Sequence, residues 1–160
     1  MNILAIDAAT KLGWALSVNG QTTSGVQLFD LKRGESPGMR WLRFGSWLRE
    51  MQRLNPIDII YFEQAHHRGG AATSVGVGFV TKIHEFAAAV GAETCPVHTA
   101  TLKSFAARTA GIKSGKGKVT MAAADKFGWS YQDDNEADAL WLLQYAITEL
   151  GCNEPLRVCS

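Results

Sequence analysis

Two short apolar runs that each end in a carboxylate constrain the fold of this 160-residue chain more than any other feature. Residues 1–6 are apolar except for Asn2 and lead to Asp7, and the mostly apolar residues 57–62 lead in the same way to Glu63. Runs of this length and character indicate strands inside a sheet. If the helix between the two strands makes the usual right-handed crossover, the strands are parallel neighbours and both carboxylates emerge at one sheet edge.

The rest of the chain predicts an α/β fold with a mixed sheet. Asn19-Gly20 suits the two-residue turn of a hairpin, so three antiparallel strands are expected before the first helix. Helices are expected where apolar residues recur at helical spacing, and Pro96 places the last strand at a sheet edge. The order indicates a layered α/β architecture, with parallel strands after the antiparallel ones and helices on both faces. The expected elements are strands at 1–6, 13–19, 22–29, 57–62 and 93–98, and helices at 39–54, 73–90, from Thr99 or Thr101 to Ala110, 119–127 and 135–150.

Length and composition indicate one domain. We assign residues 1–150 to it and residues 151–160 to a weakly ordered C-terminal tail. A net charge of +1 gives the chain no overall basic field. The chain has three cysteines, an odd number without metal-ligand spacing, which indicates a reducing compartment. Residues 1–6 lack the basic flank of a signal peptide, and no apolar run reaches the roughly 20 residues of a membrane span. We therefore expect a cytoplasmic protein that makes no membrane contact.

A third acidic segment precedes an apolar helix near the C-terminus. Asp134 and Asp138 are four residues apart, and Asn135 and Asp138 are three apart, so either pair would lie on one helical face. Crowded carboxylates repel one another unless a cation binds between them, and Mg²⁺ prefers oxygen ligands. Helix capping is the alternative, with Asp133 or Asp134 as the cap and Glu136 completing a capping box. Capping does not account for Asp138.

The three acidic segments together predict a metal site. Asp7, Glu63 and Asp138, with Asp134 or Asn135, would bring three or four oxygen ligands from three elements to one sheet edge. Two divalent cations held in this way can activate a water molecule and stabilise a leaving oxygen in phosphodiester cleavage. Each strand-end carboxylate alone could be a turn or surface residue. Their occurrence with Asp138 in this element order favours the metal site.

At this point the residues resemble those of a known family. The segments Ile6-Asp7, Phe62-Glu63-Gln64 and Glu136-Ala137-Asp138-Ala139-Leu140 are similar to motifs of the RuvC-type Holliday-junction resolvases, which have a ribonuclease-H-like fold. The order of elements matches over residues 1–150. Similar small proteins occur in bacteriophages, so a bacterial or phage-infected cell is the expected setting.

The resemblance implies a Mg²⁺-dependent crossover junction endodeoxyribonuclease that acts in DNA recombination and repair. It implies a homodimer that makes paired nicks across a four-way junction. Each active site would hold two Mg²⁺ ions, for which Mn²⁺ could substitute. A close-packing face for the dimer is expected on the helix at 73–90, at Gly76, Gly78 and residues 87–89. The implied catalytic residues are Asp7, Glu63, Asp138 and Asp134, and the implied metal ligands are Asp7, Glu63, Asp134, Asn135 and Asp138.

Residues 99–103 and 115–119 resemble the family's DNA-contacting segments. Glycines interleaved with lysines also let backbone amides approach phosphates, although these lysines could simply form a solvated loop. The loop after Glu63 carries two histidines and an arginine where the family usually has a stacking aromatic, and these side chains can stack on bases too. The expected DNA-binding residues are His66, His67, Arg68, Lys103, Lys113, Lys116 and Lys118.

The chain departs from the family at Asn135, where a carboxylate is usual. Asp134 could substitute from the adjacent position, or Asn135 could ligate through its carbonyl oxygen, so the fourth ligand stays open. Two other functions therefore remain as alternatives. One is a less selective nuclease acting on branched DNA or RNA–DNA hybrids, and the other is a junction-binding protein with impaired catalysis.

Overall fold

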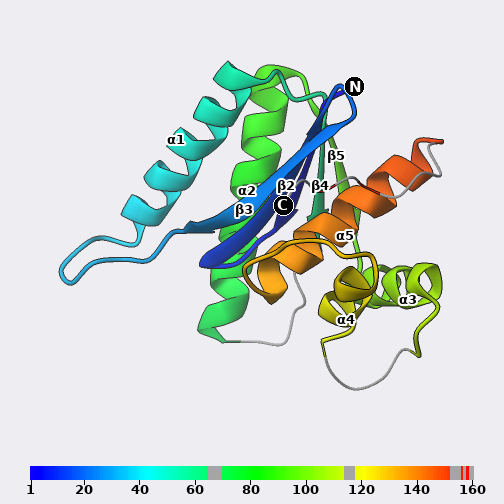
Figure 1. Cartoon of the computed structure of the whole chain (residues 1–160). Coiled ribbons are helices and arrows are strands. Elements are labelled where there is room, and N and C mark those ends of the chain that lie inside the picture. The colour runs from blue at the N-terminus through cyan, green and yellow to red at the C-terminus, as the bar shows by residue number, and fades with distance from the viewer. Residues whose placement is uncertain (65–69, 114–117, 152–155, 157, 159–160) are drawn as a thin grey trace.

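A computed structural model of the chain describes residues 1–64, 70–113, 118–151, 156 and 158 (Figure 1). Its five-stranded sheet has the order β3-β2-β1-β4-β5. The first three strands are antiparallel, and β4 and β5 continue the sheet in parallel with β1. This arrangement confirms the predicted mixed sheet. The elements are β1 Ile3–Asp7, β2 Lys11–Val18, β3 Gln21–Leu28, α1 Gly38–Leu54, β4 Ile59–Glu63, α2 Ala71–Val90, β5 Glu93–Val97, α3 Thr99–Ala110, α4 Val119–Lys126 and α5 Asp134–Glu149.

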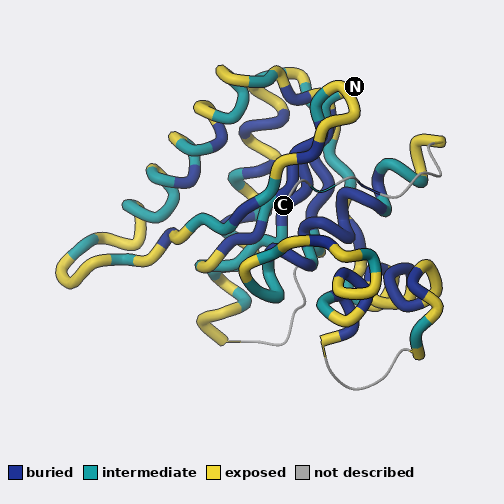
Figure 2. Tube along the Cα trace, in the orientation of Figure 1, coloured by how far each residue is buried: buried dark blue, intermediate teal, exposed yellow. Residues whose placement is uncertain are grey.

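The helices cover the sheet on both faces, with α1 and α2 on one side and α3, α4 and α5 on the other (Figure 1). Alternation along each strand sorts the side chains between the two layers. In β1, Leu4 and Ile6 pack with α1 and α2, whereas Ile3 and Ala5 pack with α3, α4 and α5. Figure 2 shows the central strands as deeply buried, and β1 and β4 are each buried at four of their five residues.

Aromatic side chains fill the layer under α1 and α2. The rings of Phe44 and Phe79 lie 4.9 Å apart at a steep angle, and Phe29 lies 5.3 Å from Phe44. Trp41 lies 5.1 Å from Phe79. A Cβ atom added to Gly78 of α2 would lie 2.3 Å from the Trp41 indole, so this glycine packs within the chain. Our prediction that Gly78 lies on a dimer face is therefore wrong, because Trp41 covers it.

Alanine and glycine line the layer under α5. Ala5, Ala15 and Ala139 are fully buried there, together with Trp141. A Cβ atom at Gly13 of β2 would lie 1.9 Å from the backbone oxygen of Asn135. The first turn of α5 therefore rests directly on β2, at a distance that only glycine permits.

The hairpin turn, the edge strand and the cap of α3 were each predicted from the sequence. Asn19 and Gly20 both have positive φ angles, of 51° and 78°, as a type I′ hairpin turn requires. The strand containing Pro96 lies at the sheet edge, as expected. The cap predicted at Thr99 or Thr101 is wrong, because His98 occupies the N-cap position of α3.

Residues 156 and 158 near the C-terminus contact the domain. Most of residues 151–160 lie outside the described part, so the weakly ordered tail stays a prediction. Leu156 is buried, its amide donates to the Gln144 side chain at 2.7 Å, and its carbonyl accepts from the Trp129 indole at 3.2 Å. Val158 forms a bridge to Thr22. Within the described ranges, no helix is long and apolar enough to cross a membrane.

Candidate active site

Strand register brings Asp7 and Glu63 to the same edge of the sheet. Ile6 pairs with Phe62 across the parallel β1–β4 ladder, so the residues that follow them stand side by side at the strand ends. Neighbouring strands lie about 4.8 Å apart. Alternation puts Asp7 on the side of Ile3 and Ala5, and Glu63 on the corresponding side of β4. Both carboxylates therefore belong to the layer covered by α5.

The close contact at Gly13 sets the position of α5 over these strand ends. Gly13 is paired with Asp7 in the β1–β2 ladder, and the backbone of Asn135 rests on Gly13. The first turn of α5 thus begins beside Asp7. Asp138 lies one turn further along the same helix as Asp134, on the same helical face.

The pKa values of Asp7 and Asp138 are raised because these carboxylates are buried close to one another. Burial is the main cause of the raised pKa of Asp7, and the charges of Asp138, Glu63 and Asp134 add to it. Burial also raises the pKa of Asp138 to about 6. Glu63 and Asp134 raise the Asp138 value further, while the Thr120 hydroxyl and the Lys103 ammonium oppose the shift. The four carboxylates thus form one electrostatically coupled group.

Two threonine hydroxyls contact this group. Thr99, the first residue of α3, donates to Oε1 of Glu63, and Thr120 of α4 donates to Oδ1 of Asp138. Lys103 lies one turn beyond Thr99 and therefore on the same face of α3. This face is turned towards the sheet edge, which explains why the Lys103 charge acts on Asp138.

The start of α5 follows one half of the capping pattern that the sequence allowed, because Asp133 caps the helix but Glu136 does not bind the Asp133 amide. Asp133 is the N-cap and accepts from the Glu136 amide at 3.1 Å, while Glu136 accepts from the Gln132 amide at 2.7 Å and from the Ser24 hydroxyl at 2.7 Å. Lys11 approaches Asp133 at 2.6 Å. Burial alone would raise the pKa of Asp133, but Lys11 and the Glu136 amide outweigh it and the pKa is lowered.

Asp134 differs from our expectation in its backbone. The helix was expected to begin at about residue 135, which would leave Asp134 free of helical geometry, but Asp134 is the first residue of α5. Its side chain is 47% exposed and lies 3.5 Å from the Lys118 ammonium. Asn135 follows it and is partly buried against Gly13. Both residues stand beside Asp7 and Asp138, and the choice of a fourth ligand between them stays a prediction.

The chemistry of the donors fits a hard divalent cation, because the coupled groups are all carboxylates, and burial together with mutual repulsion raises the pKa values of Asp7 and Asp138. In the part of the chain that the structure describes, however, no three acidic, histidine or cysteine side chains are already gathered as a metal-binding group. Glu63 and Asp138 instead point to Thr99 and Thr120. Each of these hydrogen bonds uses one oxygen of the carboxylate, Oε1 of Glu63 and Oδ1 of Asp138.

Basic residues flank the carboxylates on the side of α3 and α4. Lys103, Lys113 and Lys118 are exposed, and the charges of Lys103 and Lys118 act on Asp138 and Asp134 respectively. Four other predicted DNA contacts lie outside the described residues, namely His66, His67, Arg68 and Lys116.

Sequence reasoning missed Gly13, Thr99 and Thr120 as residues that build this site. A glycine inside a strand is a recognised sign of close backbone approach, so Gly13 carried a usable signal. Thr99 was interpreted as a cap, and nothing in the local pattern distinguishes Thr120 from other helix residues. Their contacts with Glu63 and Asp138 depend on how α3 and α4 pack in the folded chain.

No protein-family model and no curated protein sequence matches the chain. Among solved structures, the chain resembles Thermus thermophilus RuvC in complex with a Holliday junction substrate, with a TM-score of 0.70 and 14% identity over 94% of this chain and 96% of that one. A second Thermus thermophilus RuvC structure gives 0.66 and 15% over 98% and 100%. The yeast mitochondrial Holliday junction resolvase Ydc2 gives 0.61 and 11% over 88% and 76%. The chain thus has the RuvC-type, ribonuclease-H-like fold.

Proposed function

We propose that this chain with the fold of RuvC is a metal-dependent endonuclease that resolves four-way DNA junctions by paired phosphodiester hydrolysis. The observation that carries the proposal is the electrostatic coupling of Asp7, Glu63 and Asp138 at one sheet edge. The first turn of α5 rests on Gly13 beside these carboxylates. Support also comes from two RuvC structures and a mitochondrial resolvase that share the fold, one of them solved with a Holliday junction.

In this proposal Asp7 is the central ligand, because the charges of the other carboxylates in the group all raise its pKa. Glu63 and Asp138 are the second and third ligands, and Asp134 or Asn135 completes the set. Bound Mg²⁺, or Mn²⁺ in its place, would supply the positive charge that activates water and stabilises the leaving oxygen. The chain's own lysines at 103, 113 and 118 bind the phosphates on either side of the scissile bond. They orient the strand without reading its sequence.

Homodimer formation belongs to the proposal, because paired nicks in a two-fold symmetric junction require two related sites. Gly78 packs against Trp41 and Ala87 is buried in the core, but Ala88 and Ala89 on the same helix are exposed. Light scattering at micromolar concentration should give twice the 17.4 kDa mass of one chain. A monomer that still makes paired cuts would contradict this part of the proposal.

A cleavage panel tests the proposed function. Four-way junction, flap, duplex and RNA–DNA hybrid substrates are each incubated with Mg²⁺ or with a chelator. We expect metal-dependent paired cutting of the junction and little cutting of the duplex. Asp7→Asn and Glu63→Gln should abolish cleavage while junction binding persists, because these changes remove charge from the site and leave the fold intact.

The panel also separates the two alternatives. Equal cutting of flaps and hybrids would indicate a less selective nuclease. Tight junction binding without cleavage would indicate a binding protein, an alternative that Asn135 keeps open because an amide stands where a carboxylate is expected. Restoring that carboxylate with Asn135→Asp should retain or raise cleavage if the site is active.

A further inference from the structure

A second basic surface lies on a loop that projects from the same sheet edge as the carboxylates. Strands β1 and β3 are both antiparallel to β2, so they run in the same direction and end at the same side of the sheet. The connection from β3 to α1, residues 29–37, therefore projects beyond this edge (Figure 1). We refer to it as the β3–α1 arm. It stands at the opposite end of the sheet from the α3 and α4 lysines.

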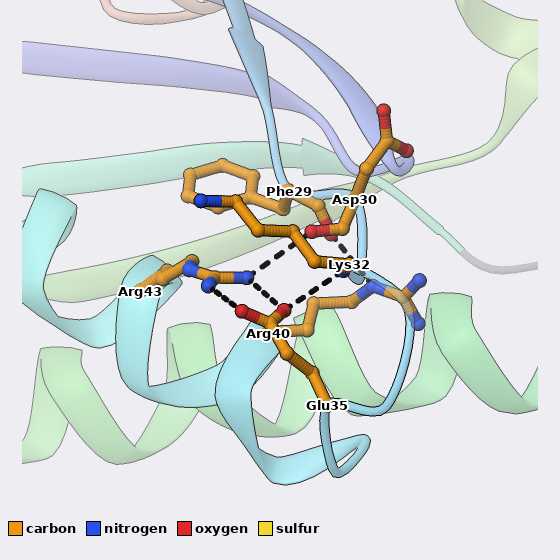
Figure 3. Close-up of polar contacts among 6 residues, drawn as sticks. All are labelled: Phe29, Asp30, Lys32, Glu35, Arg40 and Arg43. Atoms are coloured by element: carbon orange, nitrogen blue, oxygen red, sulfur yellow. Dashed lines mark hydrogen bonds and ion pairs between the residues drawn. The ribbon is translucent and has the colours of Figure 1, made fainter.

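Internal contacts fix the shape of the arm (Figure 3). Glu35 accepts two hydrogen bonds from the Arg43 guanidinium, one of them at 2.7 Å, and a third from the Lys32 amide at 2.8 Å. Arg43 also donates to the Asp30 carbonyl at 3.2 Å, and Arg40 donates through Nε to the Phe29 carbonyl at 2.9 Å. The Phe29 ring is anchored in the aromatic layer. The arm is thus tied to α1 at both of its ends.

The tip of the arm is a tight turn that presents basic side chains. The Glu35 amide donates to the Lys32 carbonyl at 3.0 Å, and Gly34 has a φ of 82°, as the third position of a type II turn requires. Lys32 and Arg33 are exposed on this turn. Among the residues that the structure describes, no carboxylate forms an ion pair with either of them.

The negative charge of Glu35 is already balanced within the arm. Its hydrogen bonds with Arg43 and with the Lys32 amide lower the pKa of Glu35 to about 2. The terminal nitrogens of Arg40 point away from the Glu35–Arg43 pair in Figure 3, and so does the Asp30 carboxylate. The basic groups left to meet a ligand are therefore Lys32, Arg33 and the outer part of Arg40, which together outweigh Asp30.

We propose that the β3–α1 arm binds the backbone phosphates of a duplex arm of the DNA substrate, about half a helical turn from the bond that is cut. Two strand spacings separate β3 from β1, or about 10 Å. Arg33 lies five residues beyond Leu28, and five residues can extend by up to about 17 Å. The basic turn then stands roughly 20 Å from Asp7, which corresponds to about six base pairs at 3.4 Å each.

This inference rests on the proposed function, because it takes the scissile phosphate to lie at the carboxylates. It adds a contact on the side of β3, opposite the lysines of α3 and α4. Lysine and arginine on a rigid turn suit phosphates, whose recognition depends on charge and position and carries no sequence information. The arm should therefore act on affinity for long duplex arms and have no part in the chemical step.

The test compares Lys32→Ala/Arg33→Ala with wild-type protein on two junctions, one with arms of about 15 base pairs and one with arms of about 4. We expect the double variant to bind the long-armed junction roughly tenfold more weakly. Its plot of log affinity against log salt should lose about two units of slope, since each phosphate contact contributes about 0.9. Binding of the short-armed junction, and its cleavage at saturating protein, should stay within about twofold of wild type.

Arg49→Ala/Arg53→Ala is the matched control. It removes the same charge from exposed positions on α1, towards the helix end that lies at the other edge of the sheet. The control should leave the arm-length dependence unchanged. The single reversal Arg33→Glu, at a side chain without a structural contact within the described part, provides a second variant if the double variant melts early.

The outcomes separate this inference from the proposed function. If wild-type protein neither binds nor cuts any branched DNA, the proposed function fails. If wild-type protein resolves junctions but Lys32→Ala/Arg33→Ala behaves like the control, the β3–α1 arm has no role and the proposed function stands. Equal weakening on short and long arms would also overturn the inference, because it would place the arm at the cut site.

Discussion

On the α1–α2 face of the sheet, large aromatic rings separate the helices from the strands, whereas on the α5 face glycine and alanine let the helix rest on the sheet. Phe44 and Phe79 are fully buried in the first layer. In the second layer the Asn135 carbonyl would lie 1.9 Å from a Cβ at Gly13. The two layers stabilise the same sheet, and the coupled carboxylates Asp7, Glu63 and Asp138 lie at the edge of the second.

The difference shows how the size of core residues sets the position of the carboxylates. A ring at position 13 or 15 would lift α5 away from the strand ends, and Asp138 would move away from Asp7 with it. Small residues in the α5 layer contribute less apolar area per residue to stability than the rings opposite. Aromatic rings stabilise both layers, since Phe105, Trp129 and Trp141 also pack together on the α5 side. What distinguishes the α5 layer is the small residues between this helix and the strands, which supply the close approach on which the coupled carboxylates depend.

The largest expected effect comes from breaking that close approach. Gly13→Ala places a methyl group against helix backbone, which cannot rotate away, so we expect a loss of more than about 4 kcal/mol in the free energy of unfolding. Urea denaturation measures it. Gly78→Ala is the matched change on the other face. There the opposing atoms are the outer part of the Trp41 indole, which can turn aside, so a loss of about 1 kcal/mol is expected. Equal losses would contradict the proposed difference between the layers.

Removing a ring from the aromatic layer should cost stability without touching the site. Phe79 is fully buried, and Phe79→Ala is expected to lower the free energy of unfolding by about 3 to 4 kcal/mol. The rise in melting temperature on adding Mg²⁺ should match that of wild type. A lost Mg²⁺ response in protein that is still folded would mean that the two layers are coupled more tightly than their separate cores indicate.

Replacing Asp138 should have the opposite effect. The change alters the site and raises the stability of the fold. Its folded pKa of about 6 lies above its ordinary value of 3.8, so the native state takes up the proton more readily. The stability from this group is therefore present below about pH 4 and is lost as the pH rises through 6. At pH 8 without metal, Asp138→Asn should be more stable than wild type by roughly 2 kcal/mol, or about 5 °C.

Melting curves at pH 4 and pH 8, with and without Mg²⁺, measure this effect. At pH 4 the gain should vanish, since wild-type Asp138 is then protonated. Mg²⁺ should raise the melting temperature of wild type at pH 8 and have little effect on Asp138→Asn. A variant that is less stable than wild type at pH 8 would show that Asp138 serves the fold through Thr120.

Much of this architecture was predictable from the sequence because it depends on short-range patterns. Apolar runs, the Asn19-Gly20 turn and Pro96 gave the strands and their order within a residue or two of the observed bounds. The carboxylates at strand ends followed from strand direction and alternation. Asp133 is the N-cap that the pattern allowed, although Glu136 accepts from the Gln132 amide and not from the Asp133 amide of a complete capping box.

What the sequence could not provide was contact between distant segments. Thr120 reaches Asp138 only because α4 packs beside α5, and Leu156 is buried only because Trp129 and Gln144 bind its backbone. The Glu35–Arg43 pair likewise depends on how the β3–α1 arm folds onto α1. Such contacts have no period or motif, so they are visible only in three dimensions.

The smallest expected effect on stability concerns Asp134, which follows the N-cap Asp133 and lies beside the other carboxylates of the site. Its carboxylate is half exposed and pairs with exposed Lys118, so Asp134→Asn should change the free energy of unfolding by less than about 0.5 kcal/mol. If Asp134 is the fourth ligand, the same change should weaken Mg²⁺ binding and slow cleavage at least tenfold, or about 1.4 kcal/mol in the transition state.

Asp133→Asn is the control, because Asp133 is the cap and is held by Lys11. It should lower the melting temperature more than Asp134→Asn and affect Mg²⁺ binding less. Calorimetric titration with Mg²⁺ decides the matter: wild-type affinity in Asp134→Asn would remove Asp134 from the site and leave the carbonyl oxygen of Asn135 as the ligand to test.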